Sequence, residues 1–386
     1  MKKPNLKVPD QKKLKSTQEL CFFEHPYTQP KNYVELFAGA MSEVIKWHEE
    51  KSQFYAQLLK NLKFNVEKWS GDLEEIPVVP ADFFKLHEIK SVREQDIVLH
   101  VTSSGTTGQK SQIFFDEWSL GSAQLMVDFI FEEYHWTQTT PANYLLYSYE
   151  PQRDLKLGTS YTDNFLTKYA PVKNLVYALK SNGKSGHDFD LYGSIRVLQD
   201  FAEQGLPVRI FGFPSFFYFT LQRMVDLCHK PLKLHPDSLV FLGGGWKGYA
   251  DQEIDKRKFY ELVESQLGIP NERLRDGFGS VEHSVPYVEC KNHNFHVPIY
   301  SKVIIRDFTS LNALGYGKRG FLQFISPYIT SVPAHSIMMG DLAVLYPAKD
   351  CGCGVQSDWF TILGRAGISK NKSCAIAASE LLRGFS

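Results

Sequence analysis

Apolar residues recur at helical spacing in the first 65 residues. The periodicity predicts two or three helices that end near Asn65 and pack as a helical subdomain. Its apolar positions are Tyr33, Leu36, Phe37, Met41, Val44, Ile45, Phe54, Leu58, Leu59 and Leu62. The stretch 76–84 should begin extended, because its two prolines disfavour helix in the residues before them, and Asp82 is expected to cap a short turn.

Short apolar runs alternate with longer amphipathic runs between residues 85 and 245. The runs predict strands at 97–101, 112–115, 143–148, 208–212 and 238–242, and helices at 119–134, 191–204 and 214–228. This alternation is typical of an α/β fold with a mostly parallel sheet. Glycine-containing loops follow the strands that end near residues 101, 212 and 242. Because ligand loops lie at the carboxyl ends of parallel strands, we expect all three loops to meet at one cleft.

Beyond residue 285 the pattern changes to short β runs. Strands are predicted at 303–306, 320–324 and 343–346, with a glycine-rich turn at 315–320. We therefore expect three parts: an N-terminal helical subdomain (1–75), an α/β core (76–285), and a β-rich subdomain with a C-terminal tail (286–386).

Composition narrows the class of protein. Of 386 residues 43% are hydrophobic, and 43 basic side chains balance 43 acidic ones. The zero net charge gives no general attraction to nucleic acid. The sequence shows neither a signal peptide nor a membrane-spanning run. The six cysteines are mostly dispersed, which indicates a reducing cytoplasm.

A loop rich in hydroxyl groups and glycine follows the strand predicted at 97–101. Glycine lets backbone N–H groups approach an anion, while the hydroxyls and one lysine add donors and positive charge, so the loop suits a polyphosphate. Its spacing differs from a Walker A loop. An ordinary polar hairpin turn is the alternative. The residues concerned are Thr102, Ser103, Ser104, Gly105, Thr106, Thr107, Gly108 and Lys110.

Three later motifs carry groups suited to the rest of a nucleotide. Phe278 beside Gly279 offers a ring face to a purine, and Glu282 offers a carboxylate to Mg²⁺. Asp341 after a glycine is placed to accept bonds from ribose hydroxyls, and Arg365 is a cation for a phosphate. Each motif alone is more often a surface turn, so their order along the chain is the informative feature.

That order resembles the adenylate-forming enzymes, and more closely the acyl-protein synthetases (LuxE family) of the bacterial bioluminescence fatty-acid reductase complex, which are relatives of phenylacetate-CoA ligases. The resemblance spans about residues 75–375. It implies the N-terminal-domain fold of adenylate-forming enzymes without their full C-terminal lid domain. The matching pieces are 80–85, 243–248, 289–290, 296–298, 333–335, 351–354 and 372–374.

The resemblance implies a two-step reaction. A fatty carboxylate attacks the α-phosphate of ATP, and the acyl group of the resulting adenylate passes to the thiol of Cys374 for delivery to a reductase or acyltransferase partner. Residues 102–110 would hold the β- and γ-phosphates, with Lys110 and Glu282 as catalytic groups. The remaining nucleotide contacts would come from Gly244, Gly245, Phe278, Gly279, Asp341 and Arg365.

Two other functions remain open from the sequence. The acidic hinge pair of CoA ligases is replaced by Ala366 and Gly367, which counts against CoA as acceptor. A ligase that passes the adenylated acid to CoA, a carrier protein or a small nucleophile is still one alternative. A non-catalytic binding module with this fold is the other. Cys374 itself is either an acceptor, activated by Lys370 and Lys372, or a small buried side chain.

A group of cysteines and histidines predicts a possible structural zinc site. Cys290 has histidines three and six positions later, and Cys351 and Cys353 form a Cys-x-Cys pair. Four such N and S donors suit tetrahedral Zn²⁺. The alternative is a reduced pair in a tight turn with surface histidines. Separately, the aromatic run 211–219 is either the wall of an acyl pocket or part of the core.

Overall fold

We describe a computed structural model of the chain over residues 6–102, 112–151, 165–183, 186–246 and 249–366. The residues fall into two compact units. The first unit comprises 1–130, 279–287 and 294–386, and the second comprises 131–278 and 288–293. The division into 1–75, 76–285 and 286–386 stays a prediction.

The first unit begins with the expected helices. They are α1 (Lys15–Cys21), α2 (Tyr33–Lys51) and α3 (Gln53–Asn61), followed by the short turns η1 (Val66–Lys68) and η2 (Leu73–Glu75). The predicted apolar stripe of α2 is buried, including Phe37, Met41 and Val44. Ser52 caps α3 by accepting the N–H of Tyr55. The helical spacing of apolar residues therefore predicted these helices correctly.

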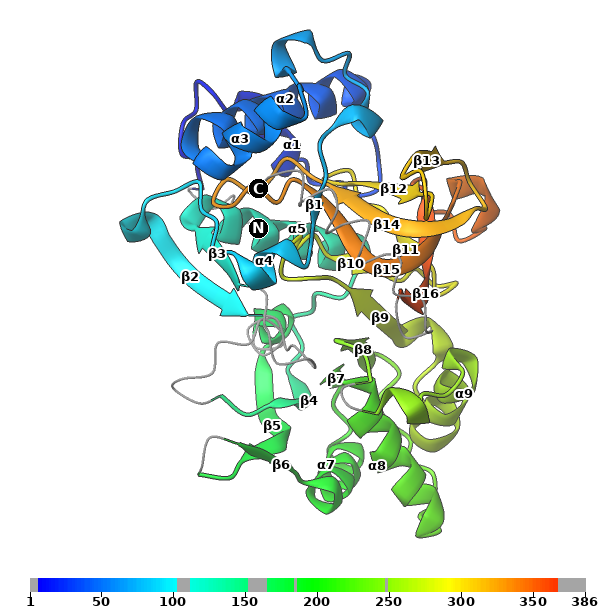
Figure 1. Cartoon of the computed structure of the whole chain (residues 1–386). Helices are drawn as coiled ribbons and strands as arrows, with labels where there is room; N and C mark the ends of the chain where they lie inside the picture. The colour runs from blue at the N-terminus through cyan, green and yellow to red at the C-terminus, as the bar shows by residue number, and fades with distance from the viewer. Residues whose placement is uncertain (1–5, 103–111, 152–164, 184–185, 247–248, 367–386) are drawn as a thin grey trace. The chain divides into compact units, whose positions relative to one another are not determined.

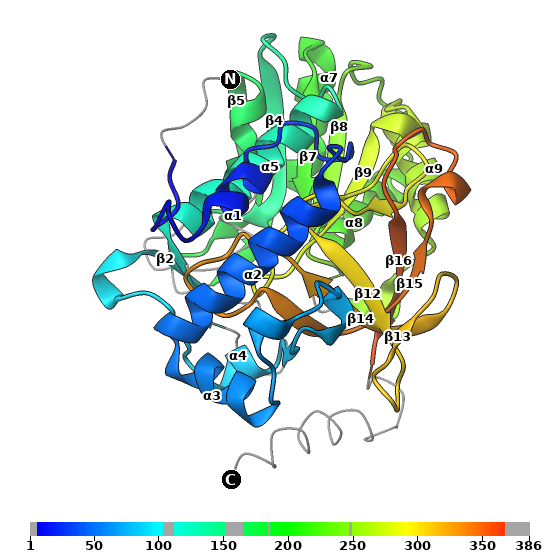
Figure 2. The same ribbon diagram turned by 90° about the horizontal axis from the view of Figure 1, so that it is seen from above.

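A mixed sheet forms the rest of the first unit. Its strands, in spatial order, are β11 (Phe295–His296), β16 (Trp359–Arg365), β15 (Ser336–Tyr346), β14 (Arg319–Ile325), β12 (Lys302–Arg306) and β13 (Ala313–Leu314). Those neighbours are antiparallel, while β1 (Val79–Pro80) pairs in parallel with β15. Helices α2 and α3 lie on one side of this sheet in both ribbon views (Figures 1 and 2). Trp47 of α2 fixes that packing by donating its indole N–H to the carbonyl of Thr330 at 2.8 Å.

Two expectations for the first unit need correction. Asp82 occupies the N-cap of α4 (Phe83–Leu86), but its carboxylate makes no capping bond and pairs with Lys85 instead. Strands β2 (Ile97–Thr102) and β3 (Gln112–Asp116) exist as predicted, yet they form a separate antiparallel pair. We predicted that the strand before Thr102 belongs to the parallel sheet. That prediction is wrong, because β2 is not a strand of that sheet. Turn η3 (Glu94–Asp96) precedes this pair, and α5 (Glu117–Glu133) follows it.

The second unit contains the predicted parallel sheet. Its order is β10 (Tyr287–Val288), β9 (Leu274–Phe278), β8 (Leu239–Gly243), β7 (Val208–Gly212), β4 (Ala142–Tyr149), β5 (Val172–Ser181) and β6 (His187–Phe189). The pairings from β9 to β5 are parallel, and β6 is an antiparallel edge strand. The alternating pattern thus predicted the sheet type correctly. The helices are α7 (Leu191–Gln204), α8 (Pro214–Asp226) and α9 (Lys256–Leu267), with turns η4 (Leu166–Tyr169), η5 (Ala250–Gln252) and η6 (Asn271–Arg273).

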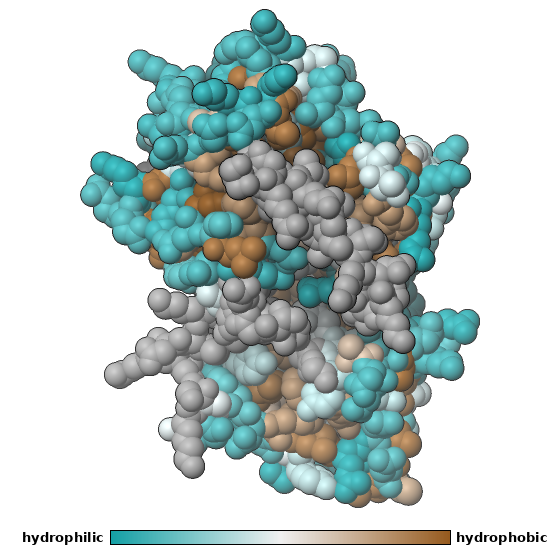
Figure 3. All heavy atoms as spheres, viewed as in Figure 1, coloured by the Kyte–Doolittle hydropathy of each residue, from teal (hydrophilic) through white to brown (hydrophobic). Residues whose placement is uncertain are grey.

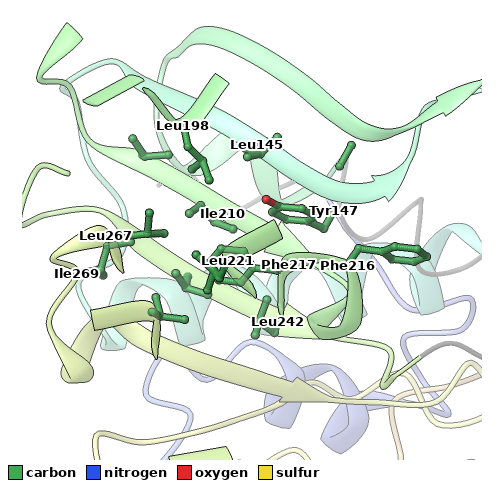
Figure 4. Close-up of a cluster of buried hydrophobic side chains, with 14 of the residues drawn as sticks. Leu145, Tyr147, Leu198, Ile210, Phe216, Phe217, Leu221, Leu242, Leu267 and Ile269 are labelled. Atoms are coloured by element: carbon green, nitrogen blue, oxygen red, sulfur yellow. The ribbon is translucent and has the colours of Figure 1, made fainter. Parts of the chain in front are cut away.

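The hydrophobic core of the second unit lies between this sheet and its helices (Figure 4). Asp190 starts α7 by accepting the N–H of Gly193 at 2.8 Å. Four aromatic side chains of the run 211–219 are buried in the core, namely Phe211, Phe213, Phe216 and Phe217. Most of that run is therefore packing, and only its last two residues, Tyr218 and Phe219, are half-buried.

Gly212 ends β7 in a conformation that only glycine adopts without strain. Its φ is +114°, and a Cβ there would lie 2.4 Å from the carbonyl oxygen of Tyr147. We expect Gly212→Ala to lower the free energy of unfolding by roughly 3 kcal/mol, from backbone strain and overpacking together. Urea unfolding would measure it. Gly205→Ala is the matched control, because Gly205 also has positive φ but has no atom within 4 Å of the added Cβ, so its loss should be about 1 kcal/mol. Equal losses in the two variants would contradict the overpacking argument.

The character of the surface and of the helices bears on contact with a membrane. Hydrophilic side chains cover much of the face that carries α2 and α3 (Figure 3). Among the helices in the described ranges, none combines the length and the apolar character that a membrane crossing requires.

Candidate active site

Asp341 and Arg365 lie opposite each other on neighbouring strands. Asp341 of β15 pairs with Arg365 of β16, and Leu342 pairs with Gly364, after which the register skips Leu363. This bulge leaves Arg365 mostly exposed while Asp341 stays buried. The Nε atom of Arg365 lies 3.7 Å from the Oδ1 atom of Asp341. The strand pairing, rather than proximity in sequence, brings these two predicted site residues together.

Glu282 joins this pair from a different segment of the same unit. It is 6% exposed and lies in a turn where the N–H of Ser284 bonds the carbonyl of Ser280 at 2.7 Å. Burial raises the pKa of the Asp341 carboxyl; Arg365 opposes that shift, and the negative charge of Glu282 adds to it. Within the described part of the chain, neither carboxylate accepts a hydrogen bond from a side chain. Two adjacent carboxylates with free lone pairs are the ligands that a divalent cation prefers.

The turn that holds Glu282 is fixed by a residue that the sequence reasoning missed. His283 is buried, and its Nε2 atom lies 2.8 Å from the hydroxyl of Tyr287. The rings of His283 and Tyr287 both stack on Phe324 of β14. His283 thus anchors the backbone next to Glu282 to the sheet. Its only sequence signal was its position directly after the predicted magnesium ligand.

In the second unit, β7, β8 and β9 end at one edge of the parallel sheet, where β7 ends in a glycine and β8 is followed by two glycines. Gly212 is in register with Leu242, and Gly243 with Gly277. Gly244 and Gly245 both have positive φ and are exposed directly after β8. Phe278 ends β9 and is half-buried. The loops after β7 and β8 therefore share one edge of the sheet, as expected, whereas their meeting with the loop after Thr102 at one cleft stays a prediction.

A network of buried charges supports the end of β9. Glu289 is fully buried and accepts hydrogen bonds from the ammonium of Lys256, from the hydroxyl of Tyr260 at 3.1 Å and from the N–H of Asp276 at 2.9 Å. Lys256 also lies 3.1 Å from the carboxylate of Asp276. Burial raises the pKa of Asp276 to about 6; Lys256 opposes this shift, and Glu289 adds to it. The network fixes the backbone two residues before Phe278. Sequence reasoning assigned no role to Lys256 or Glu289, because nothing local links them.

The Cys and His candidates occupy the other end of the β15–β16 hairpin. The Nε2 atom of His296, on β11, lies 3.3 Å from the Sγ atom of Cys351 and 3.2 Å from that of Cys353. Both cysteines belong to the connection between β15 and β16, near turn η7 (Ala348–Asp350). Cys290 is buried on the segment 288–293, which is counted with the second unit. His293 bonds Asn271 at 3.2 Å instead of joining His296.

Several predicted residues lie outside the described part of the chain. Thr102 is the last described residue of β2, where it pairs with Gln112. The phosphate-binding role of the loop and the acceptor role of the C-terminal cysteine stay predictions. The residues in question are Ser103, Ser104, Gly105, Thr106, Thr107, Gly108, Lys110 and Cys374.

A comparison with protein families decides the class of this chain. The family model for "Acyl-protein synthetase, LuxE" matches residues 10–383. The chain belongs to the LuxE acyl-protein synthetase family. The long-chain-fatty-acid–luciferin-component ligase of Vibrio harveyi is 24% identical over 341 residues, covering 87% of this chain and 85% of that protein. The enzyme of the same name from Aliivibrio fischeri is 25% identical over 324 residues, covering 81% and 80%.

Solved structures confirm the predicted fold of this LuxE family member. An open conformation of 2-hydroxyisobutyryl-CoA ligase, in complex with 2-HIB-AMP and CoA, superposes with a TM-score of 0.65 at 13% identity, covering 89% of this chain and 78% of that one. The same ligase in its thioesterification state gives 0.62 at 14% identity, covering 88% and 69%. The chain thus has the N-terminal-domain fold of adenylate-forming enzymes with a β-rich C-terminal part. Family and fold together make it an ATP-dependent, AMP-forming ligase.

Proposed function

We propose that this ligase activates a long-chain fatty acid as an acyl-adenylate and transfers the acyl group to the thiol of Cys374. The observation that carries the first step is the convergence of Glu282, Asp341 and Arg365 within one unit. The printed names of the two relatives give a long-chain fatty acid as what those enzymes act on. The thiol is a suitable acceptor because a thiolate is strongly nucleophilic even as a minor species.

The described residues fit ATP and Mg²⁺. Bound Mg²⁺ would neutralise charge on the triphosphate, which otherwise repels the attacking carboxylate. Glu282 would hold the ion, since its buried carboxylate has no side-chain donor among the described residues. Asp341 would accept bonds from ribose hydroxyls, and the exposed guanidinium of Arg365 would face a phosphate. In the second unit, Gly244, Gly245 and Phe278 lie along the sheet edge where this fold class binds ligands.

The acyl-enzyme would act in the cytoplasm and hand its cargo to a reductase or acyltransferase partner. Such a handover is what a thioester permits, because its acyl group stays activated toward a second nucleophile. The relatives' printed names give a luciferin component as what those enzymes ligate with a long-chain fatty acid.

The test is incubation of the full chain with ATP, Mg²⁺ and a panel of carboxylic acids. We expect pyrophosphate release with fatty acids, and a mass increase of the intact chain equal to one acyl group. Release without acylation of the chain, together with transfer to added CoA, would favour a CoA ligase. No pyrophosphate with any acid would favour a non-catalytic binding module.

Cys374→Ala should separate the two steps. We expect the variant to release pyrophosphate on adding ATP and fatty acid but to retain no acyl group on the polypeptide. Cys228→Ala is the matched control, because Cys228 is an exposed cysteine on the second unit and should leave acylation unchanged. Intact-protein mass measurement before and after hydroxylamine treatment reads out the thioester. Full acylation of Cys374→Ala would exclude Cys374 as the acceptor.

A further inference from the structure

A group of metal-ligating side chains lies at the connection between β15 and β16. Asp341 and Arg365 lie toward the other end of the same two strands. The ligand atoms of His296, Cys351 and Cys353 all lie within 4.8 Å of one another. We propose that these three side chains bind one structural Zn²⁺ ion and that the ion holds the β15–β16 connection against β11. The proposal concerns the folding of this region and does not depend on the proposed reaction.

The histidine is held in the tautomer that binds a metal. Its Nδ1 atom lies 2.8 Å from the backbone carbonyl oxygen of Ser357. Because a carbonyl only accepts, Nδ1 must carry the proton, and Nε2 therefore presents its lone pair. That lone pair faces both sulfur atoms at 3.2–3.3 Å. A histidine whose second nitrogen is bonded to a backbone carbonyl is the usual outer-shell arrangement around zinc.

Each sulfur accepts a hydrogen bond from an N–H donor. The backbone N–H of Val355 donates to Cys353 at 3.3 Å, and the side-chain amide of Asn294 donates to Cys351 at 3.2 Å. Donors directed at sulfur favour the thiolate, which is the form that binds zinc.

The spacing of the donors matches a tetrahedral ion. With Zn–S near 2.3 Å and Zn–N near 2.0–2.1 Å, neighbouring donors of a tetrahedral site lie about 3.5–4 Å apart. The N···S separations of 3.2 and 3.3 Å are close to this range. Cys353 lies between Gly352 and Gly354, whose φ values of +69° and +99° make the tight turn that directs both sulfurs inward. Thiolate and imidazole donors select zinc over magnesium or calcium.

The three ligands lie at the end of the β15–β16 hairpin away from Asp341 and Arg365, so the ion would stabilise the fold and take no part in the reaction. Its effect follows from the strand order. His296 is on β11, which pairs with β16, whereas the cysteines belong to the connection that precedes β16. One ion would therefore tie together both sides of β16, the strand that ends at Arg365.

The first experiment measures metal in the tag-free full chain by mass spectrometry and replaces the ion with Co²⁺. We expect about one zinc per chain, and a cobalt form with the intense visible bands of tetrahedral coordination and a sulfur-to-cobalt charge-transfer band. A chain that contains no zinc and gives only the weak spectrum of hydrated cobalt would overturn the proposal. These readouts use the unmodified protein and need neither ATP nor fatty acid, so they are independent of catalysis.

Variants then test the ligands one at a time. Cys353→Ser and His296→Gln should each weaken metal binding at least tenfold, measured by competition with a chromophoric chelator. Cys228→Ser, which changes an exposed cysteine outside the group, should keep one zinc per chain. Undiminished zinc affinity in Cys353→Ser or in His296→Gln would refute the site.

Discussion

Replacing Glu282 by glutamine is expected to lower the rate of ATP-dependent pyrophosphate release roughly 10²–10³-fold, the usual cost of removing one group that stabilises transition-state charge. The reason is the loss of a buried carboxylate from the proposed magnesium position beside Asp341. Glutamine keeps the size of the side chain, so packing is preserved. A pyrophosphate assay with saturating ATP and fatty acid measures the effect.

The same substitution should not destabilise the fold. Glu282 raises the pKa of Asp341 by repulsion, so removing its charge lowers that pKa and relieves the pair. We therefore expect an unfolding midpoint equal to or above that of the wild type. Glu35→Gln, an exposed carboxylate on α2, is the control that should leave both quantities unchanged. Full activity in Glu282→Gln would remove this residue from the proposed chemistry, whereas lost activity with lost stability would assign it a structural role.

Elements that are marked by a local sequence pattern were predicted correctly, whereas the pairing of distant strands was not. The apolar stripe of α2 and the alternating runs that became β4, β7 and β8 are local patterns, and each lies where it was expected. The loop after Thr102 was assigned to the parallel sheet because it follows a strand. Strand order is a property of long-range pairing, and β2 pairs only with β3. A strand's own residues do not specify which sheet it joins.

In the candidate site, too, local motifs could be predicted from the sequence and long-range contacts could not. Asp341 and Arg365 were singled out by motif, but their direct opposition depends on a register that skips Leu363. Glu289 was noted only as part of a resemblance, although it is the centre of the charge network below Phe278. Its partners lie 13 and 33 residues away along the chain. No local periodicity links residues at such separations, so only the structure could reveal the network.

Glu289→Ala is expected to lower the free energy of unfolding of the second unit by roughly 3–5 kcal/mol, the usual cost of removing one partner from a buried ion pair. The substitution removes the acceptor for Lys256, Tyr260 and the N–H of Asp276 at a site with no exposure to water. Glu289→Gln is the matched variant. Its amide oxygen still accepts hydrogen bonds from Tyr260 and from the N–H of Asp276, and Lys256 keeps Asp276 as a carboxylate partner. Glu289→Gln should therefore lower the free energy of unfolding much less than Glu289→Ala. Chemical unfolding followed by the fluorescence of the second unit's tryptophans measures both, and equal losses would contradict a role for charge.

Lys256→Met should instead give a loss of stability that depends on pH. The two carboxylates then lose the Lys256 ammonium, although the imidazole of His293 still lies 3.4 Å from Glu289. The pKa of Asp276, already raised to about 6 by burial, rises further because Lys256 opposed that shift. A carboxyl with a raised folded-state pKa destabilises the fold when ionised, so the deficit should be largest above pH 6 and should shrink as the pH falls toward the ordinary value near 4. The deficit should stay below that of Glu289→Ala, because 42% of the Lys256 side chain is exposed and water screens its charge. Unfolding curves at pH 5 and pH 8 measure it, and a deficit independent of pH would mean that the lysine acts through the packing of its methylene chain rather than through its charge.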